Sequence, residues 1–261
     1  MTMSDDQQSV LVTALFGGGP KVLRYDRDGV LLNTYALSGG TGTLGTVNSI
    51  VDRGSDFLVS ERVGNEVYRY DQNGNLLGGG PFITTPGGLY DMAEAPNGDI
   101  LLARSLAQQV LRYQANGSPH GTQPVAQSGY PGGFDPRSIT VDAAGNLYST
   151  FSDGSGRTMV SLLSGGIYQP EVDYADNANY ESLAFAPPAP LADGELYTTA
   201  TLEDGGRRVF RLNGGPNSDV LFYNPGQAGG EGVAITWVFP EPASLALLGL
   251  GGLVMLKRNR A

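Results

Sequence analysis

One polar residue precedes each of five similar apolar segments in this chain. The set comprises three acids, an amide and an arginine, namely Asn48, Asp91, Arg137, Glu181 and Glu231. Carboxylate and amide oxygens are the ligands that a hard cation such as Ca²⁺ prefers. If folding brings these positions together, Asn48, Asp91, Glu181 and Glu231 could hold a metal ion or another ligand. The charge of Arg137 opposes a metal, so we favour a polar, water-filled opening in which Arg137 neutralises its acidic neighbours.

Other residues that often carry chemistry stand in patterns that argue against it. The single histidine, His120, lies in a predicted loop with no Asp or Ser at the spacing of a catalytic triad. Segments 26–29 and 71–74 resemble calcium loops but lack the downstream bidentate glutamate, so we expect hairpin turns there. Absence of cysteine excludes disulfides and thiolate metal sites. We predict no catalytic residue. In each repeat, a second predicted strand follows the apolar segment. The residues at its end differ from repeat to repeat and predict no shared chemistry: Glu61, Arg104, Phe151 and Ala200.

The composition is acidic and rich in glycine. The chain has 261 residues, of which 39 are glycine and 16 proline, and a formal net charge of −10. A body with this charge repels the phosphate backbone of nucleic acids, so nucleic-acid binding is excluded as a function class. With 40% apolar residues the chain can still build a sizeable core.

A repeat of 43–50 residues dominates the sequence. The sequence VLRYD at 22–26 has related copies that begin at 67, 110, 159 and 209. An alternating apolar segment precedes each copy, and a third kind of apolar segment, near 49, 92, 138, 182 and 233, stands before the alternating one. Turn pairs such as Asn73-Gly74 separate the segments. The pattern predicts an all-β chain with four short strands in each repeat.

Repeats of this length and strand number are typical of a β-propeller, in which each repeat forms one blade. Each kind of strand occurs five times, so we predict five blades. Six blades would need a further unit within 115–136 or 164–180. The repeats are circularly shifted, and we therefore expect the strand at 233–237 to close the ring against the N-terminal strands. We assign residues 1–8 to a disordered N-terminus, 9–238 to the propeller and 239–261 to a separate tail.

The repeats resemble those of NHL and gluconolactonase-like propellers. The resemblance rests on sequences such as GNLY at 145–148 and VLRYD at 22–26. Gluconolactonase-like propellers hold a divalent metal at the mouth of the central channel with Glu, Asn and Asp ligands. The resemblance therefore implies an alternative function, a metal-dependent lactonase or lyase with Glu181 or Glu231 as ligand or base. Ca²⁺ is the one cofactor that these residues suggest.

The tail has three parts in a fixed order. The tripeptide Pro240, Glu241 and Pro242 comes first, an uncharged apolar stretch at 243–256 follows, and the chain ends in a basic cluster of Lys257, Arg258 and Arg260. We expect a short apolar helix at 243–256. Such a helix is about 21 Å long, shorter than the ~30 Å hydrocarbon core, and makes a marginal membrane anchor. The basic end would remain on the cytoplasmic side.

This tail resembles a PEP-CTERM sorting signal, found at the C-terminus of exported proteins of exopolysaccharide-producing bacteria. The resemblance implies export, recognition by an exosortase-type sorting enzyme and cleavage close to the tripeptide. It also implies contact with the membrane before processing, and exopolysaccharide or other surface proteins as partners. Members normally start with a secretory signal peptide, whereas residues 1–8 are polar and acidic, so we expect an upstream start. We predict an exported binding module of the cell envelope or extracellular matrix, and favour this function over that of a metal-dependent lactonase or lyase, which stays the alternative.

Overall fold

The structure is a computed structural model of the whole chain. It describes the backbone of residues 2–3, 9–16, 19–26, 29–39, 44–105, 107–121, 135–152, 158–164, 167–172, 179–185, 196–201, 207–212 and 219–224. Side chains are described within 9–14, 19–26, 29–39, 44–105, 107–121 and 136–150. All regular elements in these ranges are strands, which confirms the all-β prediction.

The strands form five antiparallel sheets, and in each sheet neighbouring strands follow one another along the chain. The first sheet consists of β1 (Thr2–Met3), β2 (Ser9–Phe16), β3 (Gly19–Asp26) and β4 (Leu31–Ala36). The second consists of β5 (Val47–Asp52), β6 (Asp56–Glu61), β7 (Glu66–Asp71) and β8 (Ile83–Thr84). The third has β9 (Leu89–Glu94), β10 (Ile100–Arg104) and β11 (Gln109–Tyr113).

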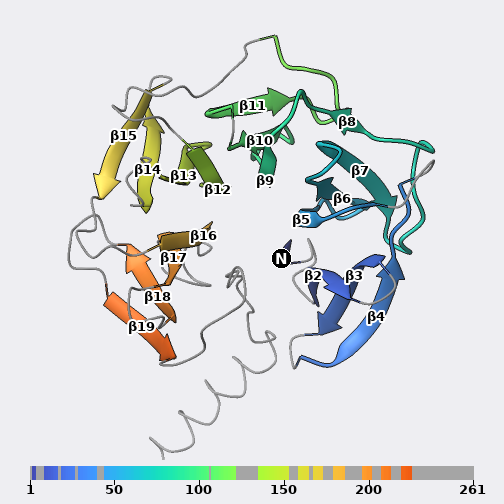
Figure 1. Cartoon of the computed structure of the whole chain (residues 1–261), viewed down its shortest axis with the longest axis horizontal. Coiled ribbons are helices and arrows are strands. Elements are labelled where there is room, and N and C mark those ends of the chain that lie inside the picture. The colour runs from blue at the N-terminus through green and yellow to red at the C-terminus, as the bar shows by residue number, and fades with distance from the viewer. Residues whose placement is uncertain are drawn as a thin grey trace, which may run out of the picture.

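The remaining two sheets repeat the same order. The fourth sheet consists of β12 (Asp135–Val141), β13 (Leu147–Ser152), β14 (Thr158–Ser164) and β15 (Ile167–Val172). The fifth consists of β16 (Asn179–Phe185), β17 (Leu196–Thr201), β18 (Arg207–Leu212) and β19 (Asp219–Asn224). The sheets stand around a common centre, to which β5, β9, β12 and β16 lie nearest (Figure 1). This is the arrangement of a propeller; that its ring has five blades remains a prediction.

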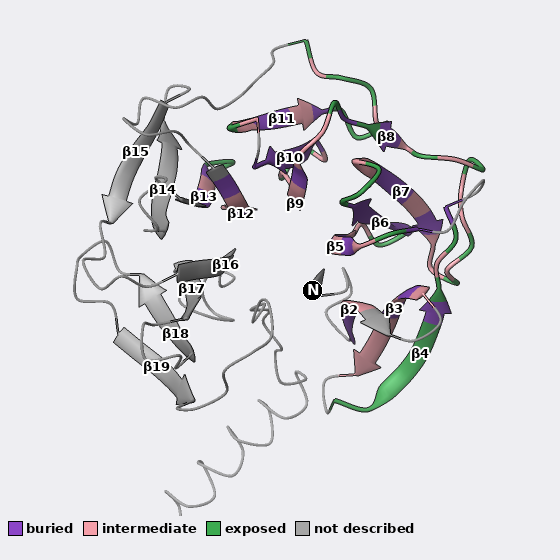
Figure 2. Cartoon of the chain, viewed as in Figure 1, coloured by how far each residue is buried: buried purple, intermediate pink, exposed green. Residues whose placement is uncertain are grey.

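Successive sheets pack face to face. Because side chains alternate between the two faces of a strand, apolar residues of one strand pack against both neighbouring sheets. In β6, Phe57 and Val59 point toward the first sheet, whereas Leu58 points toward the third. A strand covered on both sides is buried throughout, as β6 and β10 are (Figure 2). The Phe57 ring lies 5.8 Å from that of Tyr35 and stacks at 5.4 Å on that of Tyr70. The core thus consists of layers between blades: Leu11, Val22, Tyr35, Phe57, Val59 and Tyr70 in one, and Leu58, Val67, Leu89, Met92 and Leu102 in the next.

The two ends of the chain differ in what the structure describes. Within the segment expected to be disordered, β1 pairs with β2, with Thr2 opposite Leu11 and Met3 opposite Val10. This strand therefore occupies part of the edge of β2 that we expected residues 233–237 to fill. Residues 225–261, which include 233–237 and the predicted helix at 243–256, lie outside the described residues. Within the described ranges, no helix has the length and apolarity needed to cross a membrane.

Candidate functional site

A bulge interrupts β5, β9, β12 and β16 close to the N-terminal end of each strand. Pairing skips one residue of β9, β12 and β16, and in β5 it skips Asn48 and Ser49 opposite the single residue Ser60, so that each of these strands carries one extra residue. A bulge bends the strand and redirects the side chain of the extra residue. Because these four strands lie around the centre (Figure 1), their bulges form one level around it. The extra residues are Asn48, Tyr90, Arg137 and Glu181.

This register corrects the alignment of one predicted site residue. Asp91 pairs with Ala103 in the regular part of the sheet, and Tyr90 is the residue that the bulge adds. Asp91 therefore corresponds to Ser49 and Ser138, not to Asn48. Matching the repeats by polar residue type placed Asp91 one position too early, since the buried neighbours Leu89 and Met92 set the register instead.

Asp91 connects two blades by hydrogen bonds. Its Oδ2 accepts the Ile139 N–H at 2.9 Å and the Ser138 hydroxyl at 3.0 Å, both from β12 of the next sheet. Burial raises the pKa of the Asp91 carboxyl, and hydrogen bonds from Ile139, Ser49, Met92 and Ser138 act in the opposite direction. The protein's own donors thus satisfy the Asp91 carboxylate, and the role of these hydrogen bonds is to join the third and fourth sheets.

The other predicted ligands are only partly described. The Asn48 side chain is half-buried and donates from Nδ2 to the carbonyl of Tyr90 at 3.4 Å. Arg137 is also half-buried. The side chain of Glu181 and the whole of Glu231 lie outside the described residues, so the proposal of a metal or ligand held by Asn48, Asp91, Glu181 and Glu231 stays a prediction. Within the ranges that include side chains, no three His, Asp or Glu residues are grouped as around a metal ion.

Glu61, at the end of β6, shapes the loop that leads into β7. Its buried carboxylate accepts the N–H groups of Val63, at 2.9 Å, and of Gly64. A Cβ atom on Gly45 or Gly64 would lie 2.6 or 2.8 Å from the Glu61 oxygens, too close for any other residue without a rearrangement. Glu61 therefore acts on the loop backbone, and this loop presents Arg62 to solvent.

Arg104 occupies the same place in the third sheet and is likewise engaged internally. Its Nε donates to the carbonyl of Gly87 at 2.6 Å, and a terminal nitrogen donates to Gln109 at 3.1 Å. Burial lowers the pKa of the Arg104 guanidinium. The structure therefore agrees with the prediction that Glu61 and Arg104 share no chemistry.

Two acids beside Tyr68 make the protein sensitive to alkali. Burial, the hydrogen bond to Glu66 and the charges of Glu66 and Glu61 raise the pKa of Tyr68 to about 12. The unfolded chain releases this proton near pH 10, so the free energy of unfolding should fall as the pH rises from 10 to 12. We expect Tyr68→Phe to lose less stability than the wild type over this interval in urea unfolding monitored by circular dichroism. Parallel pH profiles of the two proteins would contradict this assignment.

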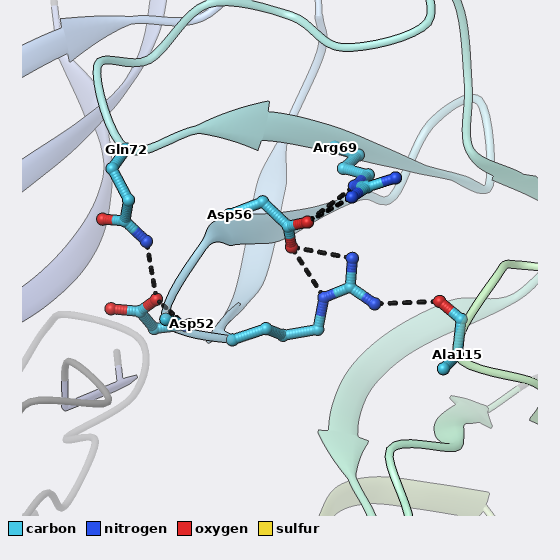
Figure 3. A network of polar contacts seen from close by, with 7 residues as sticks. Asp52, Asp56, Arg69, Gln72 and Ala115 are labelled. Carbon is cyan, nitrogen blue, oxygen red and sulfur yellow. Dashed lines mark hydrogen bonds and ion pairs between the residues drawn. The ribbon is translucent and has the colours of Figure 1, made fainter.

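A buried carboxylate ties the opposite end of the second sheet together (Figure 3). Asp56, 2% exposed, accepts Nε of Arg53 and Nε of Arg69, each at 2.7 Å. Arg53 also donates to the carbonyl of Ala115 at 2.9 Å and so reaches the third sheet. Asp99 and Arg112 form the same pair in that sheet, at 2.5 Å. These charges serve the fold.

The Asp-containing segments that resemble calcium loops are hairpin turns, as predicted. The Asp71 carboxylate accepts the N–H groups of Asn73 and Asn75 at 2.9 and 2.8 Å and the Asn75 side chain at 2.8 Å. These bonds lower the pKa of Asp71. Gly74 adopts a φ of 83°, a conformation that favours glycine. Asp142 closes the β12–β13 turn in the same way, with Ala144 and Asn146 as donors.

A polar hollow of about 440 Å³ lies at the end of the inner strands opposite the bulges. Arg53, Glu94 and Asp142 contribute its charged side chains. Arg53 is held by Asp56 and Asp142 holds its own turn, so these charges are already in use. The level of the bulges, where Asn48 and Tyr90 are half-buried, is the better candidate for binding.

A family model for the PEP-CTERM protein-sorting motif matches residues 240–261. The chain ends in a PEP-CTERM sorting motif. This motif indicates a secreted, envelope-associated protein and implies recognition by exosortase-type sorting machinery. The prediction made from Pro240, Glu241, Pro242 and the basic end is thereby confirmed at the level of the motif. No curated protein matches the PEP-CTERM chain in sequence.

Solved β-propeller structures share the fold of this chain. A structure of a nidogen/laminin complex matches with a TM-score of 0.64 at 16% identity, covering 87% of this chain and 82% of the other. TolB from Acinetobacter baumannii matches with a TM-score of 0.60 at 15% identity, covering 87% and 54%. Streptogramin B lyase matches with a TM-score of 0.58 at 15% identity, covering 86% and 67%. At these identities the likeness concerns the fold alone.

Proposed function

We propose that this chain is an exported β-propeller that acts as a binding module at the cell envelope or in the extracellular matrix, and that its tail is processed or anchors it. The match of residues 240–261 to the PEP-CTERM motif carries this proposal. The level of the bulges supports it further, since Asn48 and Tyr90 place hydrogen-bonding side chains on neighbouring inner strands there. The described acids near this level serve the fold: Asp91 joins blades and Glu61 holds a loop.

Mass spectrometry of terminal peptides tests the export part of the proposal. We expect protein from the secreted fraction to lack peptides beyond Pro242, because cleavage by the sorting enzyme close to the tripeptide would remove them. Protein in which Glu241 is replaced by Ala should keep these peptides and remain in the membrane fraction. Protein with intact C-terminal peptides in the secreted fraction would contradict the proposal, since its tail would then neither have been cleaved nor have anchored it.

A further inference from the structure

An arginine and a tyrosine from different blades lie against each other at the level of the bulges. The Arg62 guanidinium carbon is 5.0 Å from the centre of the Tyr90 ring. Arg62 is exposed and Tyr90 is half-buried. Stacking on an aromatic face leaves the N–H groups at the edge of a guanidinium available to other acceptors. The pair thus forms a flat surface with a cationic rim.

Backbone hydrogen bonds hold both partners in place before any ligand arrives. The Arg62 N–H donates to the Thr46 carbonyl at 2.8 Å, and Glu61 fixes the rest of the loop. On the other side, Asn65 of the same loop accepts the N–H of Leu89, the residue before Tyr90, at 3.1 Å. A binding surface held in this way loses little conformational entropy when it binds.

The polar groups of Arg62 and Tyr90 can form further hydrogen bonds. Among the described residues, neither the Tyr90 hydroxyl nor the Arg62 guanidinium has a hydrogen-bond or ion-pair partner, whereas Arg53, Arg69 and Arg112 each bind a carboxylate. The Asn48 amide lies beside Tyr90, and Arg137 follows at the next bulge. The chain has a net charge of −10, and Glu61 and Asp91 near this level accept backbone N–H groups, so the exposed Arg62 supplies the positive charge that a ligand would meet.

We propose that Arg62, Tyr90 and Asn48 form a binding site for a carboxylated saccharide, such as a uronic acid unit of an acidic polysaccharide. The guanidinium edge of Arg62 would bind the carboxylate through two parallel hydrogen bonds. The phenol of Tyr90 and the amide of Asn48 would bind ring hydroxyls. The net negative charge of the chain opposes binding of any polyanion, so the local contact with Arg62 must supply the preference for the carboxylate. This inference names the ligand class of the binding module and so rests on the proposed function.

Calorimetric titration with two oligosaccharides tests the inference. The probes are an oligomer of galacturonic acid and an oligomer of galactose with the same length and linkage. We expect the full chain to bind the acidic oligomer at least tenfold more tightly, and high salt to reduce the difference. Arg62→Ala should weaken binding of the acidic oligomer about tenfold or more and Tyr90→Ala about fivefold, whereas Arg62→Lys should lie between wild type and Arg62→Ala.

A matched control separates the local effect from net charge. Gln114→Asp changes the net charge by the same amount as Arg62→Ala. Gln114 directly follows β11 of the third sheet, at the end opposite to the bulge of β9, and the change introduces the residue that stands at the equivalent turn position, Asp71, of the second sheet. Its affinity should stay within twofold of wild type. Equal affinity for both oligomers, no binding of either, or unchanged binding by folded Arg62→Ala would overturn the inference. The terminal-peptide experiment tests the proposed function separately, so the two failures are distinguishable.

Discussion

Replacement of Asp56 by Ala is expected to cost about 3 kcal/mol of unfolding free energy. The change leaves Arg53, whose side chain is 11% exposed, without the carboxylate that it binds at 2.7 Å. Removing one partner of a buried ion pair typically costs 3–5 kcal/mol, because the other charge remains buried and uncompensated. We place the loss at about the lower end of that range, since Arg69 is 39% exposed and retains access to water. Guanidinium unfolding monitored by circular dichroism would measure it.

A double-mutant cycle identifies the origin of this loss. Arg69→Ala alone should destabilise less than Asp56→Ala, because Asp56 keeps Arg53 as a partner. In the Asp56→Ala, Arg69→Ala double variant the loss should be smaller than the sum of the single losses by more than about 0.5 kcal/mol. Strict additivity would refute a contribution of the Asp56–Arg69 ion pair and would leave Arg53 as the partner whose uncompensated charge accounts for the loss.

Replacement of Asp91 by Ala should cost a similar amount, about 3 kcal/mol, by a different route. The Ile139 N–H and the Ser138 hydroxyl would lose their acceptor at the boundary between the third and fourth sheets. A buried donor left unsatisfied costs about 1–3 kcal/mol. Asp91→Asn keeps one acceptor oxygen and should lose less. Thermal and urea unfolding of the three proteins would give the order.

Calcium distinguishes this structural role from the metal site that the sequence suggested. If Asp91 acts by joining blades, the loss in Asp91→Ala should be the same with a chelator and with 1 mM Ca²⁺. A metal site of micromolar affinity would instead stabilise the wild type by about 4 kcal/mol at that concentration. Stabilisation of the wild type by calcium, absent from Asp91→Ala, would contradict the blade-joining role and support a metal bound with Glu181 and Glu231.

Local patterns in the sequence determined most of the strand architecture. Alternating apolar residues and Gly-containing turn pairs predicted strands such as β6 and β10, because side chains on a strand alternate between faces and turns need positive φ. The repeat length predicted the propeller, and the order of tripeptide, apolar stretch and basic end predicted the sorting motif. Each of these signals lies within a short segment of the sequence, where covalent geometry and side-chain type suffice to predict the local structure or the motif.

Only the tertiary structure decided which residues meet at the level of the bulges. A bulge adds one residue to a strand without a local signature, so Tyr90 was missed and Asp91 was aligned one position away from its place. The contact of Arg62 with Tyr90 joins a loop of one blade to a strand of the next. Likewise, nothing near Asp56 in the sequence indicates that Arg69 completes its ion pair. Such contacts depend on strand register and blade packing, which the whole core sets, and so no short window contains them.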